Sequence, residues 1–313
     1  MIYAVLIFWL ISAIFIIRER RVYRMIIFLG AFSLINGLIY LLAGSPDVAM
    51  AEVAAGAFTT IFLIICFEKY YGFDKTRHKN ERKIKTPVSK WLPPILFTSF
   101  LFVVFVYFMP PFGYNSYLKY QYITYAYREA GGGNVVGAVL LAFRMYDTVF
   151  EALILLVVIV AVKHVSFYKE SYLSDGVHNE MERDPIAVYT IRAISPIILL
   201  FGIATTVNAL DSPGGGFQGG VIIASFFIGR YLIYNVYDVK IKLIALLEKL
   251  IYIFICAVPI FVIFAGGRFL FPEAHAPLLN NIYLATMNTL LGMKVACGFV
   301  ILFYRYIVID RRI

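Results

Sequence analysis

The sequence predicts an all-α, polytopic integral membrane protein, and two observations lead to this prediction. Of the 313 residues, 61% are hydrophobic and only 15% are charged, with a mean hydropathy of +0.82. A soluble domain of this length does not need so apolar a composition for its core. The second observation is a series of apolar stretches separated by polar segments, because a helix needs about 20 mostly apolar residues to cross a bilayer.

Counting apolar stretches on this basis predicts about nine transmembrane helices. The first stretch lacks a basic segment before it and a small-residue cleavage site after it, so we expect a retained span rather than a signal peptide. The fifth stretch contains Arg144, Asp147 and Glu151 within an otherwise apolar sequence. The expected spans are residues 1–17, 25–43, 47–68, 92–109, 135–162, 187–207, 217–237, 250–266 and 283–305.

Basic residues predict the orientation of these spans. Four arginines lie between Arg18 and Arg24, and eight lysines and arginines lie between Lys69 and Lys90, whereas the turns at 44–46 and 208–216 carry none. Since basic residues of short loops stay in the cytoplasm, we expect the N-terminus outside and the C-terminus in the cytoplasm. The net charge of +9 therefore indicates topology and contact with anionic headgroups of the lipid bilayer, and nucleic acid is not an expected partner.

Two polar, basic runs, at 70–90 and 166–185, divide the chain into blocks. No internal repeat is visible, which disfavours an autonomous transporter built from inverted repeats. The expected blocks are 1–72 with three spans, 73–165 with two spans and 166–313 with four spans.

The first motif, GSPDVAMAEVAAGAFTTIF, covers residues 44–62. Asp47 follows Pro46 in a first helical turn, where a carboxylate is stabilised by the helix dipole, so it can be a cap. Glu52 lies inside the span, with Gly56 and Thr59 on the same face at helical spacing. Gly56 leaves a gap where a neighbouring helix can approach closely. This face can form a position that binds a cation or a proton along an ion path. Alternatively, Glu52 can make a hydrogen bond that holds two helices together.

The second motif places Arg144, Asp147 and Glu151 at i, i+3 and i+7, on one side of a membrane helix. A charge at bilayer depth costs roughly 2.5–3.5 kcal/mol on insertion scales and usually faces a bundle interior or a wet cavity. Arg144 can neutralise one carboxylate and leave the other available to a proton or sodium ion. The alternative is an internal salt bridge that only makes the helix insertable.

A glycine-rich turn forms the third motif, NALDSPGGGFQGGVIIAS, at 208–225. It lacks the GxxxxGK[ST] pattern of a phosphate loop, so nucleotide binding is not expected. Glycine allows tight turns and close helix packing, which favours a structural role unless Asn208 or Asp211 meets an ion. The predicted structural residues are Pro213, Gly214, Gly215, Gly216, Gly219 and Gly220.

Two further cations lie in predicted spans. Lys294 is near the middle of the last span, too deep to reach the interface easily, so it needs a carboxylate or water. A role in an ion path and a structural role both remain open for it. Arg192 lies near the end of its span and can reach the interface, which favours a structural role.

No catalytic, metal or redox site is visible in the sequence. The three cysteines, Cys66, Cys256 and Cys297, are far apart in apolar surroundings, whereas zinc and iron–sulfur centres need clustered thiolates. The four histidines lie in predicted loops or at span ends, which disfavours a bis-histidine haem. We therefore expect no cofactor in this chain.

Three motifs in series resemble a known family. GSPDVAMAEVAAGAFTT resembles the short subunit and domain that follow the large antiporter subunit in Mrp-type cation/proton antiporters. NVVGAVLLAFRMYDTVFEALIL resembles the next element of that module, and SPIILLFGIATTVNALDSPGGGFQGGVIIAS with NTLLGMKVACG resembles an MrpB-type domain. The order is that of the D, E and F subunits of archaeal membrane-bound hydrogenase and membrane-bound sulfane reductase, joined here in one polypeptide.

This resemblance implies a sodium-handling membrane module inside a larger complex related to respiratory complex I, in the plasma membrane. It implies other Mrp-like antiporter subunits and separate redox subunits, membrane and peripheral, as partners, with sodium as a transported ion rather than a cofactor. The chain departs from the family pattern at Ala51, Gly137 and Ala142, where threonine or aspartate is common. The matched candidates are Asp47, Glu52, Arg144, Asp147, Glu151, the 214–220 turn and Lys294.

The sequence thus supports two hypotheses of different classes. The first is a subunit that provides a sodium or proton path through buried carboxylates within an ion-translocating oxidoreductase or antiporter. The second is a non-conducting structural adaptor that docks antiporter-like subunits to a redox module. Substitution of Glu52 or Asp147 is expected to change transport under the first hypothesis and assembly under the second.

Overall fold

The computed structural model describes residues 2–71, 92–108, 116–126, 133–165, 185–234, 241–266 and 277–308. Over these residues the chain is helical and contains no strand, which confirms the predicted fold class. The helices are α1 (Ile2–Arg18), α2 (Val22–Leu42), α3 (Pro46–Tyr71), α4 (Leu92–Phe108), α5 (Ser116–Tyr125), α6 (Val135–Ala138), α7 (Met145–Val165), α8 (Pro185–Val207), α9 (Gly216–Tyr234), α10 (Ile241–Gly266) and α11 (Pro277–Val308), with a π-turn η4 (Val139–Phe143) and a 3-10 turn η6 (Asn208–Leu210).

Among the described residues, six helices are long and apolar enough to cross a membrane, so the chain is a multi-pass membrane protein. Three of the nine predicted spans, at α1, α4 and α9, are helical but are not among these six, and α1 is apolar over only Tyr3–Arg18. The candidate spans are Val22–Leu42, Pro46–Glu68, Met145–His164, Val188–Leu210, Ile241–Phe261 and Asn281–Tyr306.

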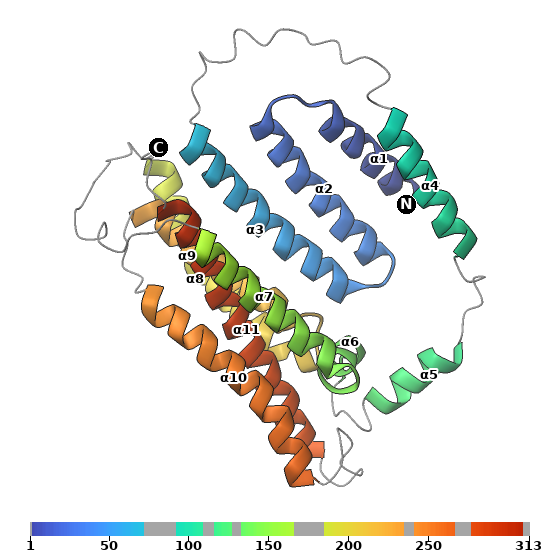
Figure 1. The fold of residues 1–313 in the computed structure, drawn as a ribbon, viewed down its shortest axis with the longest axis vertical. Helices are drawn as coiled ribbons and strands as arrows, with labels where there is room; N and C mark the ends of the chain where they lie inside the picture. The colour runs from blue at the N-terminus through green and yellow to red at the C-terminus, as the bar shows by residue number, and fades with distance from the viewer. Residues whose placement is uncertain are drawn as a thin grey trace.

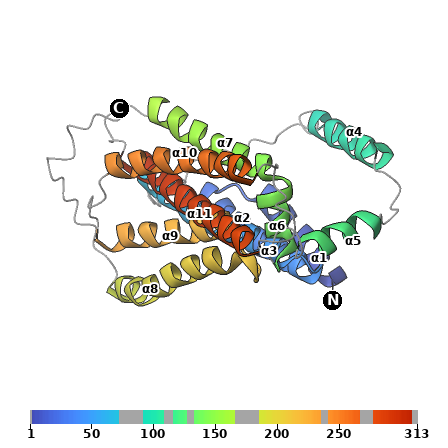
Figure 2. The same ribbon diagram turned by 90° about the horizontal axis from the view of Figure 1, so that it is seen from below.

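Helix α11 lies at the centre of the arrangement. Helices α1, α2 and α3 pack in chain order, α3 contacts α9, and α9 contacts both α8 and α11. Helices α7 and α10 pack against other sides of α11, as Figures 1 and 2 show. Of the membrane-crossing window of α11, 61% is buried, against 17–28% for the other five helices. Helix α11 therefore meets protein where the others still expose apolar surface to lipid or partners.

Small residues bring the central helices close together. A Cβ atom on Gly220 of α9 would lie 2.6 Å from the carbonyl oxygen of Gly292 in α11. A Cβ atom on Gly219 would lie 2.7 Å from the carbonyl oxygen of Gly202 in α8. Such contacts are typical of membrane helices, whose association depends on close packing rather than on hydrophobic burial. They show why α9 can touch α8 and α11 at the same time.

The predicted span at 135–162 is a broken helix. After α6, residues 139–143 form a π-turn, and α7 begins only at Met145. The widened turn frees carbonyl groups that need other donors. The Thr148 hydroxyl donates to the Leu140 carbonyl at 2.6 Å, and the Tyr283 hydroxyl donates to the Leu141 carbonyl at 3.1 Å. These side-chain bonds stabilise the break inside the bundle.

Helices α4 and α5 lie at the edge of the arrangement. Figure 2 shows α4 apart from the central helices. Its described side chains are exposed except for Val104, and the exposed ones include Phe97, Phe100 and Phe102. An apolar helix with such a surface is expected to face lipid or another subunit.

Candidate functional site

The most deeply buried charges form an ion pair between α10 and α11. The Lys294 ammonium group contacts the Glu248 carboxylate, and the two side chains are 0% and 1% exposed. The ammonium nitrogen also lies 5.3 Å from the ring centroid of Tyr252, within the range of a cation–π interaction. The expected carboxylate partner of Lys294 therefore exists, and it is Glu248.

The periodicity of the two helices places this pair inside the bundle. Glu248, Ile251 and Ile255 are buried at i, i+3 and i+7 along α10, so they share one face. Met287 and Leu291 are buried along α11 on the same face as Lys294. The charged pair thus continues two apolar stripes that pack against each other, and the pair is excluded from lipid.

Glu248 is missing from the predicted site because the predicted span was placed at 250–266. Helix α10 begins at Ile241, and its apolar window runs to Phe261. The boundary prediction was wrong because a segment containing Lys242, Glu248 and Lys249 looks like a polar connection. A signal existed, since a lysine inside the last span needs an acidic partner on a neighbouring helix.

Glu52 lies in a hydrogen-bond network across α1, α2 and α3. Its carboxylate accepts hydrogen bonds from the Ser33 hydroxyl at 3.0 Å and from the Asn36 amide nitrogen at 3.2 Å. The indole of Trp9 donates to the amide oxygen of Asn36 at 2.5 Å. Because the indole nitrogen can only donate, this bond fixes which end of the Asn36 amide faces Glu52. Neutral donors alone therefore hold this carboxylate among the described residues.

The predicted Glu52 face is only partly formed. Gly56 packs directly against Ser33 of α2, which confirms that a neighbouring helix approaches closely here. Thr59 is exposed, and the structure does not bring it to the Glu52 network. Thr60 instead packs against Gly30 of α2. The approach is so close that a Cβ atom added to Gly30 would lie 2.7 Å from the Thr60 hydroxyl oxygen. Thr60 rather than Thr59 therefore faces α2. Helical spacing counted from Glu52 does not distinguish these two neighbouring positions.

Asp47 joins three segments that are distant in the sequence. The side chain is 8% exposed, and its Oδ1 accepts hydrogen bonds from the Asn134 amide at 2.9 Å and the Gly214 backbone N–H at 3.0 Å. Asn134 caps the start of α6 by accepting from the backbone N–H groups of Val136 and Gly137. Asp47 is therefore more than a cap of its own helix, since it connects α3 to α6 and to the glycine-rich turn.

The glycine-rich turn lies between η6 and α9. Gly214 has φ of +147°, a conformation that favours glycine, and a Cβ atom there would lie 2.9 Å from the Thr205 carbonyl oxygen. The Gly216 N–H donates to the amide oxygen of Asn288 in α11 at 3.2 Å. Pro213 lines a pocket of about 270 Å³ together with Asp47, Asn134 and Asp211. The sequence did not single out Asn134 or Asn288, although the half-buried Asn134 amide and the buried Asn288 amide connect this turn to its neighbours.

The charges of the second motif lie at the surface of the described helices. Arg144 and Asp147 form an ion pair of 2.5 Å, and their side chains are 62% and 52% exposed. Glu151, one turn further along α7, is also exposed and makes no hydrogen bond or ion pair with the described residues. The structure thus forms the internal salt bridge but leaves Glu151 outside it. These side chains face lipid or a partner rather than the interior of this chain.

The predicted residues form separate groups. Asp47 meets the glycine-rich turn, Glu52 meets α2, Arg144 meets Asp147, and Lys294 meets Glu248. Within the described ranges, no hydrogen bond or ion pair connects one group to another. Nor do the described histidine, cysteine and acidic residues gather in threes as a metal centre requires. Over the part of the chain that the structure describes, the arrangement offers carboxylates at several points along a bundle and one fully buried cation, Lys294.

Two family models match the chain. Residues 186–306 match the domain related to the MnhB subunit of Na⁺/H⁺ antiporters, and residues 7–70 match MbhD, the D-type subunit of the family abbreviated MBH. The first match covers α8 to α11 and contains the Lys294–Glu248 pair. The second covers α1 to α3 and contains the Glu52 network. The two buried groups thus fall in different matched domains.

Relatives and solved structures extend these matches. A Staphylococcus haemolyticus protein whose name gives it as antiporter subunit mnhA2 is 29% identical over 158 residues, which is 50% of this chain and 19% of that protein. The protein MJ1307 of Methanocaldococcus jannaschii is 34% identical over 109 residues, 30% of this chain and 42% of that protein. The chain therefore spans less than half the length of these relatives.

The fold is found in two solved membrane complexes. A chain of the Mrp complex from Dietzia sp. DQ12-45-1b aligns with 99% of this chain at a TM-score of 0.71 and 17% identity, over 35% of its own length. A chain of the membrane-bound sulfane sulfur reductase, an archaeal respiratory membrane complex, aligns with 72% of this chain at a TM-score of 0.59 and 22% identity, over 98% of its length.

Fold and buried charges together define a class, that of multi-pass membrane subunits with ionisable groups inside the helix bundle. Within this class, the chain is similar to Mrp/Mnh antiporter subunits over two stretches, an MbhD-type segment at 7–70 and an MnhB-related domain at 186–306.

Proposed function

We propose that this chain is a subunit of a multisubunit Mrp-type module that translocates sodium ions or protons. The observation that carries the proposal is the Lys294–Glu248 pair, which is fully buried inside a domain related to an antiporter subunit. Taking two charges out of water costs several kcal/mol per ion, and their attraction only partly offsets this cost. Ionisable residues kept at such depth usually belong to an ion or proton pathway.

Glu52 supplies the second support for an ion path. Its carboxylate is held by the neutral donors of Ser33 and Asn36, so a proton or a sodium ion can neutralise it without competing with a fixed cation. Asp47, Asp147, Glu151 and Arg144 are the remaining charged candidates, and Thr59 is an uncharged one. We propose that Glu52 and Asp47 act within this chain, whereas the exposed Arg144, Asp147 and Glu151 act where a partner subunit covers α7.

The module belongs, in this proposal, to a larger respiratory complex related to membrane-bound hydrogenase or sulfane reductase. Its partners are other Mrp-like antiporter subunits, together with membrane and peripheral redox subunits. The chain crosses the plasma membrane nine times, with its N-terminus outside and its C-terminus in the cytoplasm. Residues 1–72, 73–165 and 166–313 form its D-, E- and F-type blocks, and sodium is a transported ion rather than a resident cofactor.

Transport by the reconstituted complex tests this function. The complex carrying Glu52→Gln or Asp147→Asn is purified, its subunits are counted on a native gel, and sodium-driven proton movement is followed in liposomes with a pH-sensitive dye. We expect intact assembly and reduced transport. Glu68→Gln is the control, because Glu68 is a second carboxylate of α3, sixteen residues from Glu52, and lies outside the proposed path.

The outcomes separate the proposal from a purely structural role. Full transport by both variants in an assembled complex contradicts an ion path through these carboxylates. Loss of subunits from the complex in both variants, with Glu68→Gln intact, supports a non-conducting adaptor instead.

A further inference from the structure

A pocket among the described residues lies between α5 and the broken helix α6–η4, away from the buried ion pair. It has a volume of about 570 Å³, within the range of roughly 300–1,000 Å³ typical of ligand sites. Its walls are apolar apart from two cationic side chains and one tyrosine. It is lined by Lys119, Tyr122, Ile123, Val135, Val136, Val139, Leu140 and Arg144.

Two helix faces form the walls of this pocket. Lys119, Tyr122 and Ile123 follow each other at i, i+3 and i+4, so they share one face of α5. Val136 and Leu140 form the opposite wall, and the ring of Tyr122 packs edge-to-face on Phe143 with centroids 5.8 Å apart. The pocket is therefore an apolar groove between two chain segments, and it is open on one side.

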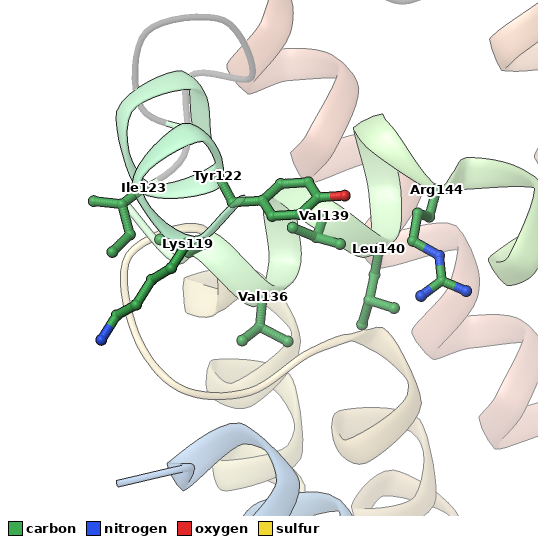
Figure 3. Close-up of a pocket in the computed structure, with 8 residues that line it drawn as sticks. Lys119, Tyr122, Ile123, Val136, Val139, Leu140 and Arg144 are labelled. Carbon is green, nitrogen blue, oxygen red and sulfur yellow. The ribbon is translucent and has the colours of Figure 1, made fainter. Parts of the chain in front are cut away.

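The cations lie at opposite ends of the groove. Figure 3 shows the Lys119 side chain at one end, the Arg144 guanidinium at the other, and Val136 and Leu140 between them. Asp147 contacts one guanidinium nitrogen of Arg144. The Arg144 side chain is 62% exposed, and a guanidinium has five N–H donors, so donors remain for a second partner. The groove thus combines an apolar floor with positive charge at its ends.

Helix α5 indicates the depth of the groove in the membrane. With ten residues, Ser116–Tyr125, it is far shorter than the roughly 20 residues that cross a bilayer. Four of its residues are tyrosines, Tyr117, Tyr120, Tyr122 and Tyr125, and tyrosine is enriched at headgroup level. The other wall is the start of the broken helix α6–η4–α7. The groove therefore lies where lipid headgroups meet their acyl chains.

We propose that this groove is a binding site for one anionic phospholipid, with an acyl chain against Val136 and Leu140 and the phosphate near Lys119. Charge complementarity supports this occupant, because ammonium and guanidinium groups bind phosphate through charge-assisted hydrogen bonds. An acidic helix from a partner would have to bring its carboxylates to the edge of the hydrocarbon region, which is costly. A lipid brings its phosphate at this level already.

Photolabelling of the intact complex tests the site. The purified complex is placed in nanodiscs that contain phosphatidylglycerol or phosphatidylcholine with the same diazirine-labelled acyl chain, and labelled peptides are identified by mass spectrometry. We expect labelling at 119–123 and 135–144, about fivefold stronger for phosphatidylglycerol, the factor expected from one lysine near a phosphate. Lys119→Gln should remove this headgroup preference, and Val136→Trp should reduce labelling by both lipids because the indole fills the groove.

Lys163→Gln, a matched substitution of an exposed lysine near the other end of α7, should leave the labelling unchanged. Equal labelling by the two lipids in the unmodified complex overturns the proposal, as does labelling that Val136→Trp leaves intact. A crosslink from Lys119, Val136 or Leu140 to another subunit shows that protein occupies the groove and also overturns the proposal. If Val136→Trp prevents assembly, the headgroup preference of Lys119→Gln decides the outcome.

Discussion

Two regions of this molecule hold a carboxylate between helices in different ways, one half-buried and one fully buried. In the layer of α1, α2 and α3, Glu52 accepts hydrogen bonds from Ser33 and Asn36, which are both neutral. In the pair of α10 and α11, Glu248 contacts the Lys294 ammonium, and neither side chain reaches the surface. The Glu52 carboxylate can bind or release a cation from outside the chain, whereas the Glu248 carboxylate already has a cation, Lys294, beside it.

This difference predicts different consequences for stability and transport. A buried charge whose partner is removed is left uncompensated, which costs about 3–5 kcal/mol. A carboxylate held by neutral donors loses only hydrogen-bond strength when it is neutralised, about 0.5–1.5 kcal/mol. The Lys294–Glu248 pair should therefore dominate the stability of the bundle, and Glu52 should matter more for ion movement.

The largest expected effect follows from Lys294→Met. This change leaves the Glu248 charge buried without a cation and should lower the free energy of unfolding by about 3–5 kcal/mol, measured by denaturant titration of the purified subunit in bicelles. The double variant Glu248→Leu with Lys294→Met removes both charges and should recover most of this loss. If the double variant is as unstable as Lys294→Met, the pair is not the cause. If it is stable and still transports, the pair lies outside the ion path.

Asp47→Ala should have the next largest effect. It leaves the buried Gly214 N–H without its acceptor, at about 1–3 kcal/mol, whereas the Asn134 amide loses one acceptor and keeps the Ala209 and Ser212 carbonyls. The same titration measures the loss, and Asp211→Asn is the control because Asp211 is exposed at the same pocket. An equal effect of the two changes would show that Asp47 does not hold the junction.

Glu52→Gln should affect stability less. Glutamine keeps an acceptor for Ser33 and Asn36, so we expect a loss of roughly 0.5–1.5 kcal/mol together with reduced sodium-driven proton movement. Both the free energy of unfolding and the sodium-driven proton movement should be measured on one preparation, so that the Glu52 site and the Lys294–Glu248 pair are compared directly. A loss as large as that of Lys294→Met would mean that Glu52 is also a structural charge.

The smallest effect is expected for Thr59→Ala. Thr59 is exposed and lies outside the Glu52 network, and surface substitutions usually change stability by less than about 0.5 kcal/mol. Thr60→Ala is the informative partner, since Thr60 packs against Gly30 of α2 and donates to the Gly56 carbonyl at 2.7 Å. A larger loss from Thr59→Ala than from Thr60→Ala would contradict the observed orientation of α3.

Sequence reasoning predicted the helical class and several local features of the site. It identified Gly56 as a point of close helix approach, and it required a carboxylate or water beside Lys294, which the structure resolves as Glu248. These predictions succeed because each depends on one residue type and its cost in an apolar environment. The 3.6-residue period also correctly placed Arg144 beside Asp147.

Other features depend on which helices meet, and apolar sequences carry little of that information. Asn134 and Asp47 are 87 residues apart, and their hydrogen bond follows from the packing of α3 near α6. Glu248 was missed because a helix boundary was placed at 250 rather than 241. The π-turn at 139–143 has no local signal, because its freed carbonyls are satisfied by Thr148 on the following helix and by Tyr283 on α11.

The glycine contacts between α8, α9 and α11 have a mechanical consequence. A Cβ atom on Gly220 would lie 2.6 Å from a backbone oxygen of α11, and one on Gly219 would lie 2.7 Å from a backbone oxygen of α8. Sliding one helix by a single turn would bring larger side chains into these backbone-to-backbone gaps. We therefore expect α8, α9 and α11 to keep their register, so that any conformational change of this chain occurs in the helices packed around them.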